Sequence, residues 1–152
     1  MELLTLSIGV GLAVALVFSE LFGLAAGGVV VPGYIALYLG QPFSIAYTLA
    51  ASFLTFALVK SSSSLFVIYG RRRTALMILV GYLIGLGGRA ALGTYFSQFV
   101  SEDAQVIGYI IPGLIAIWFD RQGAIITTCA LSIAAVVVRL ILILLVGTEV
   151  HA

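Results

Sequence analysis

The chain alternates between long apolar runs and short polar interruptions. An α-helix needs about 20 apolar residues to cross the hydrocarbon core of a bilayer, and several of the runs reach that length. Glycine, proline and charged residues mark the ends of the runs. The pattern predicts an all-α polytopic membrane protein, with a single transmembrane domain over residues 1–152. Its six hydrophobic segments lie at about Leu3–Phe22, Leu24–Leu39, Phe43–Tyr69, Thr74–Val100, Val106–Phe119 and Ala124–Val146.

The second and fifth segments each contain a Pro-Gly pair, Pro32-Gly33 and Pro112-Gly113, between β-branched residues and a further apolar run. Proline removes a backbone donor and clashes with the preceding turn, and glycine adds conformational freedom. In lipid, each freed N–H or C=O group needs an internal partner. One pair alone would indicate a simple kink. Two pairs at matching positions predict helices that are interrupted rather than bent, at the interface of two repeats.

The two halves of the chain resemble each other at a spacing of 80 positions. Identical residues recur around each Pro-Gly pair and again in the long segment that follows it. Lys60 falls one position from the counterpart of Arg139. The pattern predicts two three-element repeats, at about residues 1–70 and about 74–152, rather than a solenoid. The matching pairs are Gly28/Gly108, Pro32/Pro112, Gly33/Gly113, Ile35/Ile115, Ala36/Ala116, Ile45/Ile125, Thr48/Thr128, Ala50/Ala130 and Ser52/Ser132.

The basic cluster Arg71–Arg73, which we place in a loop between the two halves, sets the predicted orientation. Loops rich in arginine and lysine stay on the cytoplasmic side of the membrane, so this loop is expected there. If each Pro-Gly segment crosses the membrane, the second repeat is inverted and both termini lie outside. If these segments re-enter instead, the repeats are parallel and both termini lie inside. Acidic Glu102 and Asp103 outside and Arg121 inside favour the inverted arrangement.

Glycines are frequent in the first and fourth segments, where they allow close helix contact. Gly9 and Gly11 lie within the first segment, and Gly23 and Gly27 follow in GxxxG spacing. The fourth segment contains Gly81, Gly85, Gly87 and Gly88.

Composition supports the membrane assignment and excludes several kinds of site. Hydrophobic residues make up 62% of the chain and charged residues 9%, whereas about a quarter of a soluble domain is charged. The single cysteine, Cys129, and the single histidine, His151, support neither a disulfide nor a metal site. The start of the chain lacks the basic residues of a signal peptide, so the first segment is expected to remain as a span.

Four charged residues lie inside apolar segments: Glu20, Lys60, Arg89 and Arg139. A charge at the centre of a bilayer costs about 2.5–3.5 kcal/mol on insertion scales, so each of the four needs an explanation. Three cations against one acid predict an interior that faces an anion or a polyanion. In the alternative interpretation, the cations pair with Glu20, contact lipid phosphates or extend to the membrane surface. Arg89 is the hardest to explain that way, because it follows about 22 Å of helix.

Sequence motifs for catalysis are missing from the chain. It contains no phosphate-binding G-x-x-x-x-G-K-[ST], no H-E-x-x-H and no G-x-S-x-G. Glu102 and Asp103 are adjacent in a polar loop and do not form an acid–base pair. We therefore expect a non-catalytic membrane subunit that conducts, binds or positions a partner, with no cofactor, metal or nucleic acid of its own.

Five stretches of the chain carry a resemblance to a known family: Phe18-Ser19-Glu20, Gly28–Tyr34, Val67-Ile68-Tyr69-Gly70-Arg71-Arg72-Arg73, Ile110–Ala116 and Gln122-Gly123. Together they resemble the CapC/PgsC family, the small membrane subunit of bacterial poly-γ-glutamate synthase. The resemblance covers nearly the whole chain, and its motifs are specific in combination and weak singly. The family element in the third stretch is Tyr69-Gly70-Arg71-Arg72, so neither Arg73 nor Arg139 can be tied to a motif of the family, which offers no catalytic residues to carry over.

The resemblance implies partners and a place in capsule biosynthesis. One partner is a cytoplasmic, Mur-ligase-like amide ligase, which would use ATP and a divalent metal to add glutamate to a γ-linked chain. Another is a membrane-anchored subunit associated with release or transport of the polymer. The chain would be a multi-pass protein of the bacterial cell membrane. It would anchor the ligase through Arg71–Arg73 and accept the polyanion. The sequence leaves open whether the chain forms a homo-oligomer. The alternative is a stand-alone secondary transporter or channel for small anions, as the repeats suggest.

Overall fold

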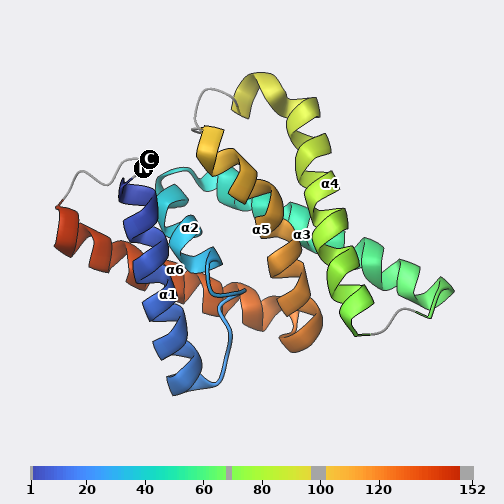
Figure 1. The fold of residues 1–152 in the computed structure, drawn as a ribbon, viewed down its shortest axis with the longest axis horizontal. Coiled ribbons are helices and arrows are strands. Elements are labelled where there is room, and N and C mark those ends of the chain that lie inside the picture. The colour runs from blue at the N-terminus through green and yellow to red at the C-terminus, as the bar shows by residue number, and fades with distance from the viewer. Residues whose placement is uncertain (1, 68–69, 97–101, 148–152) are drawn as a thin grey trace.

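The computed structural model describes residues 2–67, 70–96 and 102–147, without the side chains of residues 2, 89, 92–96 and 102–108. Within these ranges the chain is all-helical and contains no strand (Figure 1). Six α-helices and one short 3-10 helix follow one another along the sequence. They are α1 (Glu2–Phe22), α2 (Val31–Leu37), η1 (Tyr38–Gly40), α3 (Pro42–Leu65), α4 (Arg71–Phe96), α5 (Glu102–Gln122) and α6 (Ala124–Val146).

Three helices in the described part of the chain are long and apolar enough to cross a membrane. They are Leu3–Phe22 in α1, Pro42–Leu65 in α3 and Ala124–Val146 in α6. The sixth predicted segment has the bounds of α6. By contrast, α2 has seven residues and rises about 10 Å. The predicted second segment therefore contains only a short helix.

The two Pro-Gly pairs have different local structures. Pro32 lies in the first turn of α2, where a proline costs no hydrogen bond, and the chain before Val31 is not helical. The predicted interruption is correct there. Pro112 lies inside α5, which continues from Glu102 to Gln122, so the prediction of a second broken helix is wrong. Membrane helices tolerate such a proline when neighbouring groups satisfy the freed carbonyl.

Glycines upstream of the first pair explain this difference. Gly27 and Gly28 have φ values of 77° and 122°, a backbone conformation that side chains with a Cβ rarely adopt. Gly23 also has a positive φ, and it follows the end of α1 instead of forming a helix contact with Gly27. Gln122 holds this irregular segment, because its amide accepts a hydrogen bond from the Ala25 N–H and donates one to the Ala25 carbonyl.

Glycine pairs bring helices into backbone contact in both halves. A Cβ atom on Gly11 would lie 2.6 Å from the Cα of Gly33, and one on Gly81 would lie 2.6 Å from the Cα of Gly113. In both α1 and α4 the buried residues recur every four positions. They are Ser7, Gly11 and Ala15 in α1, and Met77, Gly81 and Gly85 in α4.

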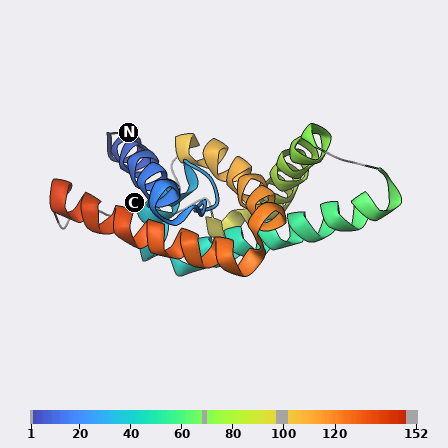
Figure 2. The same cartoon turned by 90° about the horizontal axis from the view of Figure 1, so that it is seen from below.

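The helices of the two halves interlock. In Figure 1, α1 and α4 run in opposite directions, as do α2 and α5, and α3 and α6. The main contacts of α6 are with α1 and α2, whereas α3 packs on α4 and α5. The third helix of each half thus lies against the other half, and Figure 2 shows α3 and α6 along one edge with the remaining helices above them. Residues from both halves form one core cluster, including Val31, Tyr34, Ile111, Ile115 and Leu131.

Candidate functional site

The three consecutive arginines form the first turn of α4, so their predicted placement in a loop is wrong. Arg71 and Arg72 are exposed and Arg73 is half-buried. The Nη2 of Arg73 lies 2.5 Å from the Oδ1 of Asp120 at the end of α5. Of the three arginines, only Arg73 has an acidic partner among the described residues. Since a helix N-terminus is itself partially positive, three cations there are unfavourable unless an anion approaches them.

Arg139 contacts a helix end in the interior. From the middle of α6, its Nη1 donates to the carbonyl oxygens of Ala36 at 2.9 Å and Leu37 at 3.4 Å. These are the last two residues of α2, and carbonyl groups at the C-terminal end of an α-helix lack α-helical partners. A cation at this position also interacts favourably with the helix dipole. The geometry gives Arg139 a role in capping α2.

Lys60 is exposed on α3, with its Nζ 5.3 Å from the centre of the Phe56 ring. Ser63 and Ser64 donate from their hydroxyls to the carbonyls of Lys60 and Ser61 in their own helix. Their hydroxyl hydrogens are therefore engaged within α3.

The predicted set of intramembrane charges is not gathered at one place. Lys60 and Arg139 lie in the second halves of α3 and α6, and those ends extend toward opposite sides of the molecule (Figure 1). Glu20 is exposed near the end of α1 and forms no ion pair with a described side chain. The side chain of Arg89 lies outside the described residues.

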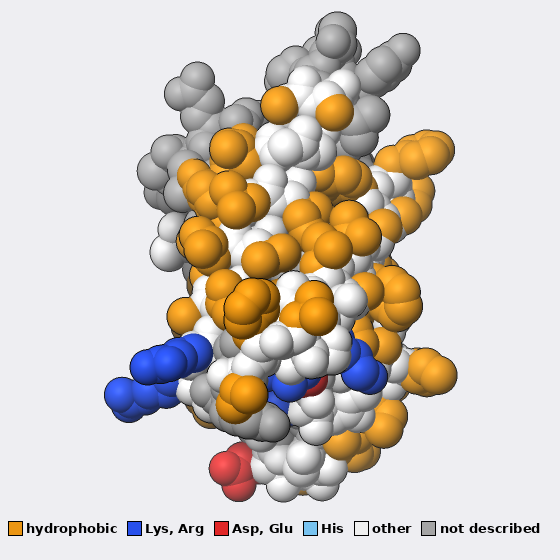
Figure 3. All heavy atoms as spheres, turned by 90° about the vertical axis from the view of Figure 1, so that its right-hand side faces the viewer, with side chains coloured by type: hydrophobic (Ala, Val, Ile, Leu, Met, Phe, Trp, Pro, Cys, Tyr) orange, Lys and Arg blue, Asp and Glu red, His pale blue; other side chains and the backbone are white. Residues whose placement is uncertain are grey.

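Basic side chains gather on the face that contains the start of α4. Figure 3 shows them as a band across the lower part of this face, with a mostly hydrophobic surface above them. The exposed arginines of the described part are Arg71 and Arg72 at the start of α4 and Arg121 at the end of α5. Sequence reasoning missed Asp120 as the partner of Arg73, although an acidic residue at the end of an apolar helix was a visible signal.

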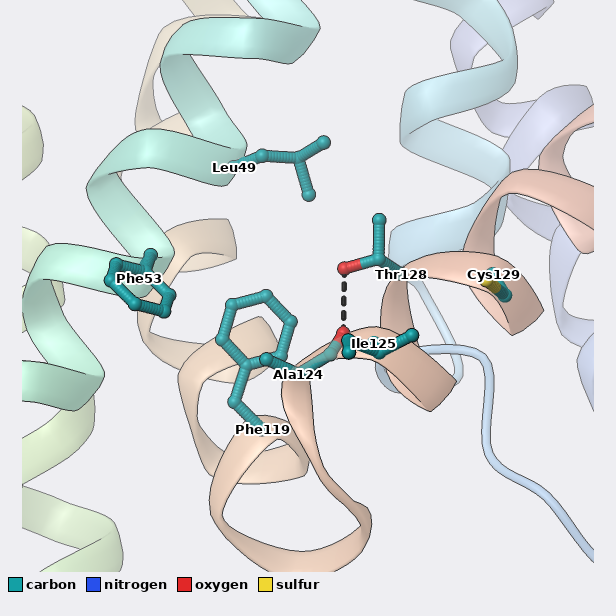
Figure 4. A pocket seen from close by; sticks show the side chains of 7 residues that line it. All are labelled: Leu49, Phe53, Phe119, Ala124, Ile125, Thr128 and Cys129. Atoms are coloured by element: carbon teal, nitrogen blue, oxygen red, sulfur yellow. Dashed lines mark hydrogen bonds between the residues drawn. The ribbon is translucent and has the colours of Figure 1, made fainter.

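A second surface feature is an apolar cavity of about 370 Å³ between α3 and α6 (Figure 4). Leu49 and Phe53 face it from α3, and Phe119 closes it from the end of α5. The hydroxyl of Thr128 donates to the carbonyl of Ala124 in its own helix, so it adds no free donor to the lining. Cys129 is exposed there. No group of three potential metal ligands occurs among the described residues.

Comparison with known proteins identifies the family. The family model described as "Capsule biosynthesis CapC" matches residues 10–128. That range includes both Pro-Gly pairs and the Arg73–Asp120 ion pair, while Arg139 lies beyond it. No solved structure matches the chain.

Two relatives cover most of the chain. The "PGA biosynthesis protein CapC" of Bacillus subtilis (strain 168) is 38% identical over 120 residues, which are 77% of this chain and 78% of the relative. The "Capsule biosynthesis protein CapC" of Bacillus anthracis is 36% identical over 124 residues, or 79% of this chain and 80% of the relative. The chain belongs to the CapC family of capsule biosynthesis proteins.

Proposed function

We propose that this chain is an integral membrane subunit of a poly-γ-glutamate synthase, which anchors the ATP-dependent amide ligase and assists synthesis and export of the anionic polymer. The family match and the names of the two relatives, one for PGA biosynthesis and one for capsule biosynthesis, support this role. Three long apolar helices support a location in the cell membrane.

The observation that carries the anchoring role is the unpaired charge at the start of α4. Arg71 and Arg72 are exposed next to the partially positive end of a helix, whereas Arg73 is neutralised by Asp120. Such an arrangement is electrostatically unfavourable in the isolated chain. An acidic surface on a cytoplasmic ligase would relieve it, and the positive-inside rule puts this end of α4 in the cytoplasm.

In this proposal the chain has one transmembrane domain that contains two inverted repeats, with both termini outside. Three observations support the repeat: opposite helix directions, equivalent glycine contacts, and a shared burial pattern in the third helices. Residues 51, 52, 55 and 59 of α3 are buried, as are residues 130, 131, 134 and 138 of α6, each 79 positions later. In that register Lys60 is the counterpart of Arg139.

The polymer would meet Lys60 and Arg89 on its way across the membrane. Poly-γ-glutamate has one carboxylate per residue, and an unpaired carboxylate in a bilayer costs several kcal/mol. Lysine offers a mobile point charge, and arginine can bind a carboxylate through two parallel hydrogen bonds. Arg139 would support the path indirectly by holding α2 in place. The subunit itself is proposed to be non-catalytic, with ATP and a divalent metal bound by the ligase.

Purification in mild detergent tests this role. A tagged chain, co-expressed with the ligase and the further membrane-anchored subunit, is expected to retain the ligase through affinity and size-exclusion steps. The control is the same preparation from cells without the tagged chain. Isolation of the chain alone, together with small-anion flux after reconstitution into liposomes, would contradict the proposal and support a stand-alone anion transporter.

A further inference from the structure

A cavity of about 160 Å³ lies where α4 begins and α5 ends. Two arginines and one acid, Arg73, Arg121 and Asp120, contribute its charged groups. The remainder of the lining comes from Gly70, Thr74, Met77 and Ile117. A cavity of this size is large enough for several water molecules or one small polar group. The partially positive N-terminus of α4 adds to the net positive charge.

The hydrogen bonding within the cavity is incomplete. Arg73 uses Nη2 for its contact with Oδ1 of Asp120, and its Nε is buried without a partner among the described residues. Leaving a buried N–H without an acceptor is costly. Asp120 uses one oxygen for this pair, so the second oxygen is available to a donor. The Arg73–Asp120 pair at the cavity wall therefore leaves hydrogen-bonding capacity unused on both side chains.

Arg121 contributes a second cation, which pairs with no acid in the part of the chain that the structure describes. Its guanidinium lies 5.6 Å from the centre of the Trp118 ring, a distance that allows a cation–π contact. Such a contact holds the guanidinium in place and leaves its N–H donors exposed at the edge. Arg121 can therefore donate to a carboxylate while it remains stacked on Trp118.

The residues at the corresponding positions of the first half are uncharged. When α1 is aligned with α4 so that the buried Gly11 matches the buried Gly81, Leu3 is the counterpart of Arg73. Leu3 packs against the cluster of Ala36, Val138 and Leu142. In the register of the Pro-Gly pairs, Gly40 and Gln41 are the counterparts of Asp120 and Arg121. The charged cavity belongs to one half only, so it is not a requirement of the helix packing.

We propose that this cavity binds an α-amino-acid head group, an ammonium and a carboxylate on one carbon. Asp120 accepts hydrogen bonds from the ammonium, and the guanidinium groups of Arg73 and Arg121, which line the cavity, donate to the carboxylate. Two cations and one anion select a ligand that has both charges over an ammonium alone. In a γ-linked glutamate chain this head group occurs at the amino end, and it also occurs in free glutamate. The assignment to glutamate rests on the proposed function. The assignment to an α-amino-acid head group rests on the charge pattern alone.

Calorimetric titration of the detergent-purified chain tests the proposal with three probes: γ-glutamyl-glutamate, its N-acetyl derivative and free glutamate, each in both enantiomers. We expect saturable binding of the free dipeptide and at least about tenfold weaker binding of the acetylated one, because Asp120 then has no ammonium to bind. Stronger binding of the dipeptide than of free glutamate would assign the site to the amino end of the polymer. Stronger binding of glutamate would assign it to the free amino acid. Absence of binding, or equal affinity for free and acetylated dipeptides, would overturn the proposal.

Variants separate the binding role from folding. Arg121→Gln and Asp120→Asn should each weaken dipeptide binding by about tenfold or more. Arg121 forms no ion pair in the described part, so Arg121→Gln should keep the melting temperature even if Asp120→Asn lowers it. Gln41→Ala, at the counterpart of Arg121, is the matched control and should retain the affinity. Unchanged affinity in Arg121→Gln would overturn the proposal. These titrations need no ligase. The binding proposal can therefore fail even if the chain co-purifies with the ligase, and the two outcomes are distinguishable.

Discussion

The backbones of α1 and α2 meet at Gly11 and Gly33, with no room for a side chain between them. A Cβ atom on Gly11 would lie 2.6 Å from both the Cα and the N of Gly33. The second half repeats this contact between α4 and α5 at Gly81 and Gly113. Close approach of this kind maximises dispersion contacts, which replace the hydrophobic effect as the attraction between helices in lipid.

Replacing Gly11 in α1 or Gly81 in α4 with alanine should therefore destabilise the fold. We expect Gly11→Ala and Gly81→Ala each to cost about 1–3 kcal/mol, because the added methyl group forces two backbones apart. Thermal unfolding in detergent would measure the loss as a lower melting temperature. Gly9→Ala and Gly87→Ala are the controls, since a Cβ at those positions meets nothing within 4 Å. Equal melting temperatures for all four variants would contradict the close contact.

Arg139→Gln should reduce stability, whereas Lys60→Gln should not. Arg139 donates to two carbonyls at the end of α2, and a hydrogen bond to a charged group contributes about 1.5–3 kcal/mol. Lys60 is exposed, and its contact with Phe56 is worth about 0.5–1 kcal/mol at such a site. Membrane abundance and melting temperature measure the difference. A stable Arg139→Gln protein would show that the cap is dispensable.

Lys60→Gln and Arg89→Gln should lower polymer output while the protein stays inserted and bound to its ligase. The reason is the loss of positive charge along the proposed polymer path. Measuring membrane abundance, ligase co-purification and polymer yield on the same cultures separates this effect from misfolding. Normal yield in both variants would eliminate the path. A yield that falls only in proportion to abundance would assign the two residues to structure.

Gln122→Ala should loosen the irregular segment between α1 and α2. The Gln122 amide makes two hydrogen bonds with Ala25, and each bond is worth about 0.5–1.5 kcal/mol. Hydrogen exchange of residues 23–30 should therefore become faster. Thr128→Ala is the control, because the Thr128 hydroxyl bonds within its own helix. Unchanged exchange in Gln122→Ala would show that other contacts hold this segment.

A cysteine at position 72 tests the orientation of the chain. In a Cys129→Ser background, Arg72→Cys should resist a membrane-impermeant thiol reagent in intact cells and react after permeabilisation, because arginine-rich ends stay in the cytoplasm. Ready labelling in intact cells would reverse the orientation.

Hydrophobic patterning predicted the helical class and the bounds of α6, because those features depend on local sequence. It failed at Pro112, since the effect of a Pro-Gly pair depends on the residues before it. Gly27 and Gly28 supply positive φ values ahead of Pro32, whereas α5 is already helical ahead of Pro112. Patterning also could not separate Gly11, which meets another backbone, from Gly9, which meets nothing, because both lie in the same apolar run.

The candidate site was predicted only in part. Charge inside an apolar segment pointed to Arg139, but its partners, the carbonyls of Ala36 and Leu37, depend on where α2 ends. The counterpart residue Lys60 finds no such helix end, because α5 continues to Gln122. The Arg73–Asp120 pair joins positions 47 residues apart, and only the antiparallel packing of α4 and α5 brings them together.

Charge reversal at the start of α4 tests the central claim most directly. The double variant Arg71→Glu with Arg72→Glu should reach the membrane in normal amounts, lose the ligase on purification in detergent and produce little polymer. Lys60→Gln provides the comparison, with the ligase retained and the polymer reduced. If the double variant co-purifies with the ligase as the unaltered chain does and polymer yield is normal, the proposed anchoring role of this surface is contradicted.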